Sequence, residues 1–154
     1  MLPPIKIEIR ERGPVPRKMK VAHNAAAKAT WQETGLFFHA TMSDDRFTQA
    51  HATLAGYQKR TKAYTARKFK KFGHTRPLEY SGTTRRLVRT ANIAATSKGA
   101  QVRYPGARAF NFRNPKARQP INMAEEFRKI IPKEATELAA EFDRQYDQKI
   151  NQIN

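Results

Sequence analysis

The residues with the most evident chemistry are cations. Eleven of the residues from 59 to 89 are Lys or Arg, and the single acid among them is Glu79. Like charges at this density destabilise a fold unless an opposite charge compensates them. We therefore expect contact with the phosphates of a nucleic acid, or with an acidic surface of a neighbouring protein. The candidates for facing DNA or another subunit are Lys59, Arg60, Arg67, Lys68, Lys70, Lys71, Arg85, Arg86 and Arg89.

A segment containing proline and glycine lies in the middle of these cations. Pro77 fixes its own backbone φ, and we expect Gly82 to occupy a conformation that residues with a side chain reach poorly. Together with Ser81, these residues predict a stiff structural turn between two basic segments. The alternative is an ordinary flexible loop.

Aromatic residues are interleaved with the cations. On a helix they could stack on nucleic-acid bases, but this spacing is more typical of core residues. They are Tyr57, Tyr64, Phe69 and Phe72. Sequence-specific recognition is not predicted, because no helix-turn-helix, zinc-finger or ribonucleoprotein motif is present.

No pattern in the sequence indicates an enzyme. Ser81 and Gly82 lack the flanking glycine of a nucleophile elbow, and no glycine-rich phosphate-binding motif occurs. The chain has no cysteine, which excludes disulfides and thiolate metal sites. We expect no catalytic residue, no metal and no cofactor.

The histidines are scattered, and none has the spacing of a metal site. They are His23, His39, His51 and His74. His39 with Asp44 and Asp45 could be drawn as a metal or nuclease site. We favour a simpler interpretation, in which Ser43 caps a helix and the two acids suit the positive end of its dipole.

The overall composition is that of a small basic subunit. The chain has 154 residues, the length of one domain, of which 39% are hydrophobic, and its net charge is +17. Its mean hydropathy is −0.79. A chain so poor in apolar residues is expected to complete its burial against neighbours. No apolar stretch approaches the roughly 18 residues of a spanning helix, and no secretory signal is evident, so we expect a protein made in a cytoplasm without membrane contact.

Hydrophobic periodicity predicts the elements that position the cations. Residues 5–11 alternate apolar and charged side chains, which predicts a half-buried strand. Residues 16–34 are rich in alanine at helical spacing, and Gly35 is expected to end that helix. A second, amphipathic helix is expected from Ser43 to about Phe72, with Gly73 just past its end.

The second half of the chain predicts a hairpin and a long helix. Residues 85–97 and 99–106 read as two strands joined at Lys98 and Gly99. Residues 107–120, with Phe110 and Phe112, form a basic loop bounded by prolines.

From Asn122, which with Glu125 resembles a capping arrangement, apolar residues keep helical spacing to the end. Pro132 is expected to kink this helix or to begin its second half.

These elements predict one α+β domain over residues 1–154. A small antiparallel β-sheet is packed by two or three helices, and a long helix closes the chain. The segments are an N-terminal strand or arm (1–14), a helical region (15–72), a turn, β-hairpin and basic loop (73–120) and the C-terminal helix (121–154).

The stretch from about residue 31 to 89 resembles small tailed-bacteriophage proteins of the head–tail joining and tail-completion kind. These proteins carry a helix rich in Arg, Tyr and Lys, then a Pro-Leu-x-x-Ser/Thr-Gly turn, a β-hairpin and a long final helix. The matching positions are Trp31, Phe47, Tyr57, Arg60, Tyr64, Lys68, Gly73, Pro77, Leu78, Ser81 and Gly82. The residues after the glycine, 83–85, depart from the pattern, in which a hydrophobic residue often comes sooner.

The resemblance implies a structural virion protein at the head–tail junction, made in the host cytoplasm and without enzymatic activity. It implies a homo-oligomeric ring of about six or twelve copies between connector and tail proteins, with possible non-specific contact to DNA passing through it. A stiff turn would then fix where the basic helix of every subunit ends.

Two alternatives stay open. A basic RNA-binding protein of a ribosome-like particle has the same charge. A membrane-surface binder is less well supported, because the basic helix carries tyrosines rather than a broad apolar face.

Overall fold

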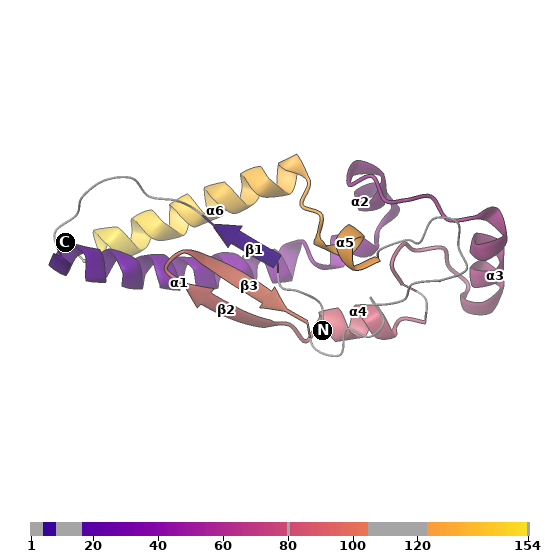
Figure 1. Ribbon diagram of the computed structural model, residues 1–154, viewed down its shortest axis with the longest axis horizontal. Helices are drawn as coiled ribbons and strands as arrows, with labels where there is room; N and C mark the ends of the chain where they lie inside the picture. The colour runs from indigo at the N-terminus through magenta and orange to yellow at the C-terminus, as the bar shows by residue number, and fades with distance from the viewer. Residues whose placement is uncertain (1–4, 9–16, 80, 105–122, 154) are drawn as a thin grey trace.

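The computed structural model describes residues 5–8, 17–79, 81–104 and 123–153. The strands are β1 Ile5–Glu8, β2 Asn92–Thr96 and β3 Gly99–Arg103. The helices are α1 Arg17–Thr41, α2 Gln49–Leu54, α3 Lys62–Phe72, α4 Thr83–Val88, α5 Met123–Arg128 and α6 Pro132–Asn151, with a short 3-10 helix at Asp44–Phe47. The predicted α+β class, with a small antiparallel sheet and a long C-terminal helix, is confirmed (Figure 1).

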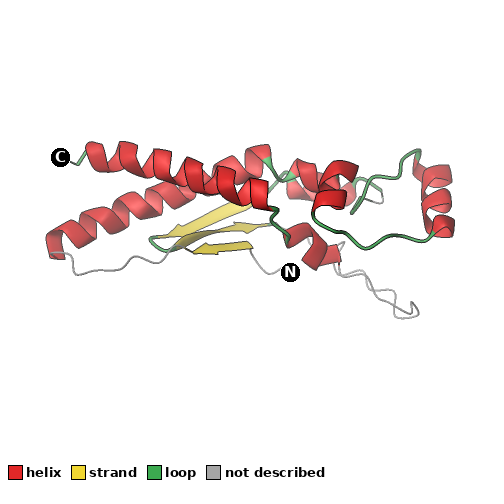
Figure 2. Ribbon diagram, turned by 90° about the horizontal axis from the view of Figure 1, so that it is seen from above, coloured by secondary structure: helices red, strands yellow, loops and turns green. Residues whose placement is uncertain are grey.

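Among the described residues, the helices cover one face of the sheet. β3 is the central strand and pairs antiparallel with both β1 and β2. Along β3, Ala100 and Val102 are buried, whereas Gln101 and Arg103 are not. Figure 2 shows the strands lying to one side of the two long helices. The predicted strand at 5–11 is confirmed over β1, and residues 9–11 lie outside the described residues.

Gly35 does not end the first helix, and this prediction is wrong. α1 runs through it to Thr41. A Cβ at Gly35 would lie 2.7 Å from Cγ2 of Ile93 and 3.4 Å from Cβ of Ala100, so the glycine lets α1 approach the sheet closely. α1 also packs against α6, where the rings of Trp31 and Phe142 are 4.4 Å apart.

The single amphipathic helix predicted from Ser43 to Phe72 is wrong as well. The chain forms the 3-10 helix, α2 and α3 instead, because extended residues separate them. Thr48 is extended and caps α2, since its Oγ1 accepts from the N–H of His51 at 3.2 Å. Thr61 caps α3 in the same way. The predicted cap at Ser43 is not formed, since its side chain makes no capping bond.

The predicted hairpin forms, but the first half of its first strand, which was predicted over residues 85–97, is not a strand. Residues 83–88 form the short helix α4 instead of strand, with Thr84 and Val88 buried one turn apart. β2 and β3 then pair continuously from Asn92 with Arg103 to Thr96 with Gly99. The turn consists of residues 97 and 98, and Gly99 already belongs to β3. The predicted basic loop at 107–120, with its two phenylalanines, lies outside the described residues.

The C-terminal segment divides at Pro132, as predicted. α5 ends at Arg128, and α6 begins at Pro132, whose missing N–H costs nothing at a first helical position. The carboxylate of Glu134 accepts from the N–H of Ile131 at 3.1 Å and completes the start of the helix. The proposed cap at Asn122 lies outside the described residues.

Candidate polyanion-binding surface

α3 carries a dense group of the predicted cations. This helix lies at the end of the molecule opposite the chain's C-terminus, away from the sheet (Figure 1). Its sequence, KAYTARKFKKF, carries five cations and no acid. Gly73 ends it with φ +71 and donates its N–H to the carbonyl of Phe69 at 2.8 Å, which confirms the predicted stop.

Two adjacent rows of residues form the outward face of α3. Residues four apart lie one above the other on a helix, so Lys62, Ala66 and Lys70 make one row. Ala63, Arg67 and Lys71 make the other row. All six are exposed. Because alanines lie between the cations, a rod-shaped polyanion could approach the helix backbone closely along this face. We call these six residues the cationic face.

Arg60 and Lys68 face inward and hold α3 in place. Both carboxylate oxygens of Glu126 accept from Arg60, at 2.9 and 2.7 Å, and Oε1 also accepts from the N–H of Gln58 at 2.7 Å. Lys68 is buried, and its ammonium donates to the carbonyl of Arg76. Burial, together with the nearby charge of Arg60, lowers the pKa of Lys68 to about 8. These two cations therefore act on the position of α3 rather than on an outside partner.

The turn segment between Gly73 and α4 contains two left-handed residues, one of which is Gly82, as predicted. Leu78 is buried with φ +56, a left-handed conformation that few residues with a side chain adopt. Gly82 has φ +88 and immediately precedes α4. Pro77, directly before Leu78, is half-buried, and the hydroxyl of exposed Ser81 lies 3.1 Å from that of Thr83. These two left-handed residues restrict the backbone conformation of this segment.

Glu79 lies buried inside that turn and is its electrostatic anchor. Its carboxylate accepts from Arg76 at 2.7 and 2.9 Å, and Arg85 lies 3.7 Å away. The one acid of the basic region is therefore part of the turn.

Arg85 and Arg89 form ion pairs within the chain. Oδ2 of Asp44 lies 3.3 Å from a guanidinium nitrogen of each. Partial burial would raise the pKa of Asp44, but the hydrogen bonds and charges of Arg85 and Arg89 outweigh it and lower that pKa below its usual value. Asp44 thus serves these arginines rather than a helix dipole. Arg86 and Lys59 are exposed, and no ion pair joins either to another described residue.

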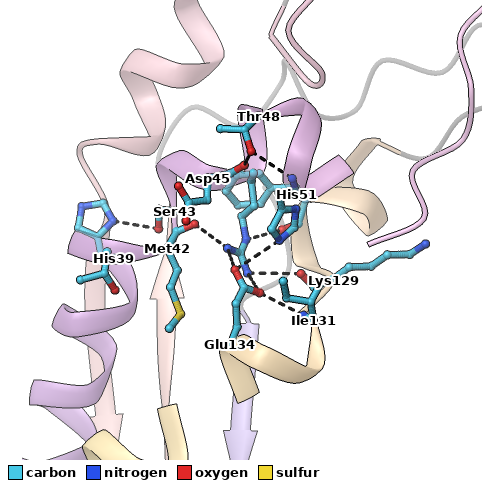
Figure 3. Close-up of polar contacts among 12 residues, drawn as sticks. His39, Met42, Ser43, Asp45, Thr48, His51, Lys129, Ile131 and Glu134 are labelled. Carbon is cyan, nitrogen blue, oxygen red and sulfur yellow. Dashed lines mark hydrogen bonds and ion pairs between the residues drawn. The ribbon is translucent and has the colours of Figure 1, made fainter. Parts of the chain in front are cut away.

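A buried arginine connects the 3-10 helix to the C-terminal segment. Arg46 is fully buried, and its Nε donates to the carbonyl of Phe127 at 3.0 Å. Its Nη1 and Nη2 donate to the carbonyls of Met42 and Lys129, at 2.7 and 3.3 Å. The same nitrogens donate to the two carboxylate oxygens of Glu134, at 2.9 and 3.2 Å. Figure 3 shows Met42, Lys129 and Glu134, which belong to different segments of the chain, lying close to one another.

His51 completes this buried cluster. Its Nε2 lies 3.3 Å from Oε1 of Glu134, and its Nδ1 lies 3.1 Å from the hydroxyl of Tyr57. Burial alone would raise the pKa of Glu134, but His51 and Arg46 outweigh it and lower that pKa below its ordinary value. Burial raises the pKa of Tyr57. Tyr57 thus packs against the core, whereas Phe69 is exposed on α3.

The polar groups near His39 include the buried hydroxyl of Ser43. Ser43 Oγ lies 3.4 Å from Nδ1 of His39 and 3.1 Å from the hydroxyl of Tyr104, but Ser43 is only 2% exposed, so no substrate reaches its oxygen. Within the described ranges, no group of three or more His, Cys, Asp or Glu side chains could hold a metal ion. None of the described helices is long and apolar enough to cross a membrane.

No family model, curated protein or solved structure matches this chain. Of the predicted candidates, the structure brings Arg67, Lys70 and Lys71 together on one exposed face. The sequence analysis did not identify the buried partners Arg46, Glu126 and Glu134. Glu79 carried a signal, because it is the one acid in a basic segment.

Proposed function

We propose that this chain is a non-enzymatic structural subunit of a tailed-phage particle, located at the head–tail junction, and that α3 faces DNA there. The observation that carries this proposal is the cationic face of α3, whose flanking segments form ion pairs with the buried acids Glu126 and Glu79. The resemblance in residues 31–89 supplies the particle and its location.

The short length and high positive charge of α3 favour a polyanionic partner. A helix of 11 residues is marginal in water without packing. Five like charges on it add repulsion, and Lys68 is its one buried side chain. A phosphate backbone along the cationic face would remove this repulsion and release counterions. Binding of this kind depends on the backbone and is indifferent to base sequence.

A ring of copies fits the same proposal. The sequence is poor in apolar residues, and large side chains such as Leu36 and Leu54 stay exposed in the single chain. In a ring, α3 of each subunit would add to one positive belt around a DNA passage. Neighbouring connector and tail proteins would cover other surfaces of the subunit.

One observation favours a second candidate, an RNA-binding protein of a ribosome-like particle. Phe69 is 59% exposed and lies on α3 between cations of the sequence. An exposed aromatic ring beside Lys and Arg suits stacking on unpaired bases, which duplex DNA does not offer.

The test is a salt titration of binding to a short DNA duplex, followed by fluorescence anisotropy. Replacing Arg67 and Lys70 together with Ala should flatten the log–log slope by up to about two units. The control replaces Lys133 and Arg144, two exposed cations of α6, with Ala and should leave the slope unchanged. Equal slopes for both double variants would contradict the proposal. A preference for structured RNA over duplex at matched salt would favour the second candidate.

A further inference from the structure

The outer edge of β2 carries backbone groups without a partner strand. β2 pairs with β3 alone, and in Figure 1 it is the border strand opposite β1. Thr96 and Gly99 pair across a two-residue turn, so this pair exchanges its hydrogen bonds. Alternation along the strand then turns the N–H and C=O of Ile93 and Ala95 away from β3. Among the described residues, no strand lies along this edge.

The sequence does not protect this edge in the usual ways. Native edge strands carry Lys, Pro or a bulge that discourages further pairing. Residues 90–97, TANIAATS, contain neither a charge nor a proline, although 28% of the chain is charged. The register of β2 with β3 is continuous, without a bulge. Ile93 and Ala95 pack against the core cluster of Trp31 yet stay partly exposed, so the core itself opens at this edge.

We propose that β1 of a second copy adds to β2 in parallel, so that the sheet continues from one subunit into the next. β1 and β2 are both antiparallel to β3, and they therefore run in the same direction. A second copy, related to the first by a rotation, can place its β1 beside the free edge of β2 so that the two strands run in the same direction. The helices of both copies then stay on the same face of the joined sheet.

Charge selects β1 of the second copy over a second β2. Glu8 is paired with Gly99 and Lys98 precedes that residue, so Glu8 and Lys98 lie at the same end of the sheet. In the parallel arrangement the added Glu8 comes to the end that carries Lys98. Two β2 strands would pair antiparallel, and each Lys98 end would then meet the end that carries Arg103. Two cationic contacts would result, in a chain whose net charge is already +17.

The contact is head-to-tail, which closes into a ring where the rotation permits. In this respect the inference depends on the proposed function and gives its ring an interface. The edge of β2 and the cationic face of α3 belong to different elements, so the proposed subunit contact and the proposed DNA contact can be tested independently.

Cysteine cross-linking tests this contact directly, because the native chain has no cysteine. Lys6 and Ala94 are both paired with Gln101, from opposite sides. Within one chain β3 separates them by roughly 9–10 Å, beyond the roughly 7 Å that a disulfide spans. Between copies they would be neighbours. A mixture of the single variants Lys6→Cys and Ala94→Cys should give a disulfide-linked dimer under mild oxidation, and the double variant a ladder on a non-reducing gel.

The control pairs Lys6→Cys with Ala139→Cys, an exposed position on α6, and should give no linked dimer above random collision. Lys98→Glu in the Ala94→Cys chain should reduce the linked fraction, and Glu8→Lys in the Lys6→Cys chain should restore it. Linkage of Ala94→Cys to itself in preference to the mixture, or a mixture no better than the control, would overturn the inference. If salt-dependent DNA binding by α3 persists in that case, the proposed function stands without this interface.

Discussion

Arg46 and Glu134, which are 88 positions apart in the sequence, form a bidentate ion pair with nitrogen–oxygen distances of 2.9 and 3.2 Å. The arginine side chain is completely buried and the glutamate side chain is 7% exposed. The pair joins the segment before α2 to the start of α6. Together with Arg60 and Glu126, it shows that two acids of the C-terminal segment are buried and pair with arginines that precede α3.

Arg46→Met should lower the free energy of unfolding by about 3–5 kcal/mol, because removing one member of a buried ion pair leaves the other charge uncompensated. The carbonyls of Met42, Phe127 and Lys129 also lose a donor. Urea denaturation measures the loss. Lys133→Met, on the exposed side of α6, is the control and should change stability by less than about 0.5 kcal/mol. Similar midpoints for both variants would contradict a structural role of the pair.

Glu134→Gln should change the pH dependence of stability. The pKa of Glu134 is lowered in the folded chain, so its carboxylate stabilises the fold above the ordinary carboxyl pKa of about 4.3. That contribution is lost as the pH falls through the lowered pKa. The stability difference between the native chain and Glu134→Gln should be complete at pH 6 to 7 and shrink toward zero on acidification, in thermal melts at about half-unit pH steps. A difference independent of pH would show that the carboxylate charge is not involved.

Lys68→Met should reveal a linkage of the same sign at alkaline pH. The folded chain lowers the pKa of Lys68 to about 8 from an ordinary 10.5, so the unfolded chain retains this proton over a higher range. Between these values the stability of the native chain should rise with pH relative to Lys68→Met. The matched control is Lys70→Met, which replaces an exposed lysine of the same helix. Parallel curves for both variants would place Lys68 in solvent.

The sequence predicted features that depend on local backbone chemistry well, and features that depend on tertiary packing poorly. The strand at residue 5, the division at Pro132 and the stop at Gly73 were correct, because each depends on local backbone chemistry. Gly35 was misread as a stop, because glycine also permits close packing. Only the position of Ile93 in the folded chain decides between those two roles.

The candidate site was predictable in its charge but not in its geometry. Sequence spacing treats Arg67 and Arg85 alike, yet one lies on the exposed face of α3 and the other pairs with Asp44. Such pairs join residues about 40 positions apart, beyond any helical or strand period. Likewise, no local pattern indicates that Glu126 holds Arg60.

Gly82→Val should destabilise the fold by about 1–3 kcal/mol, because its φ of +88 is unfavourable for a β-branched residue. The cost comes from the backbone, since an added Cβ would lie no closer than 3.7 Å to Oε1 of Glu79. Gly82→Asn is the matched control and should recover much of the loss, because Asn tolerates this conformation. Thermal melts compare the three chains. Equal melting temperatures for Val and Asn would indicate the flexible loop that the sequence left open.

Arg85→Ala and Arg86→Ala should separate structural from DNA-facing arginines within α4. Arg85 is paired with Asp44 and lies 3.7 Å from Glu79, so its loss should cost about 1 kcal/mol of stability and leave the salt slope of DNA binding unchanged. Arg86 is exposed, so its loss should leave stability within about 0.5 kcal/mol and flatten the slope by up to about one unit. Urea denaturation and salt titrations on both variants make the comparison. A flattened slope for Arg85→Ala at unchanged stability would mean that its guanidinium leaves Asp44 to meet phosphate, and α4 would then belong to the DNA-binding surface along with α3.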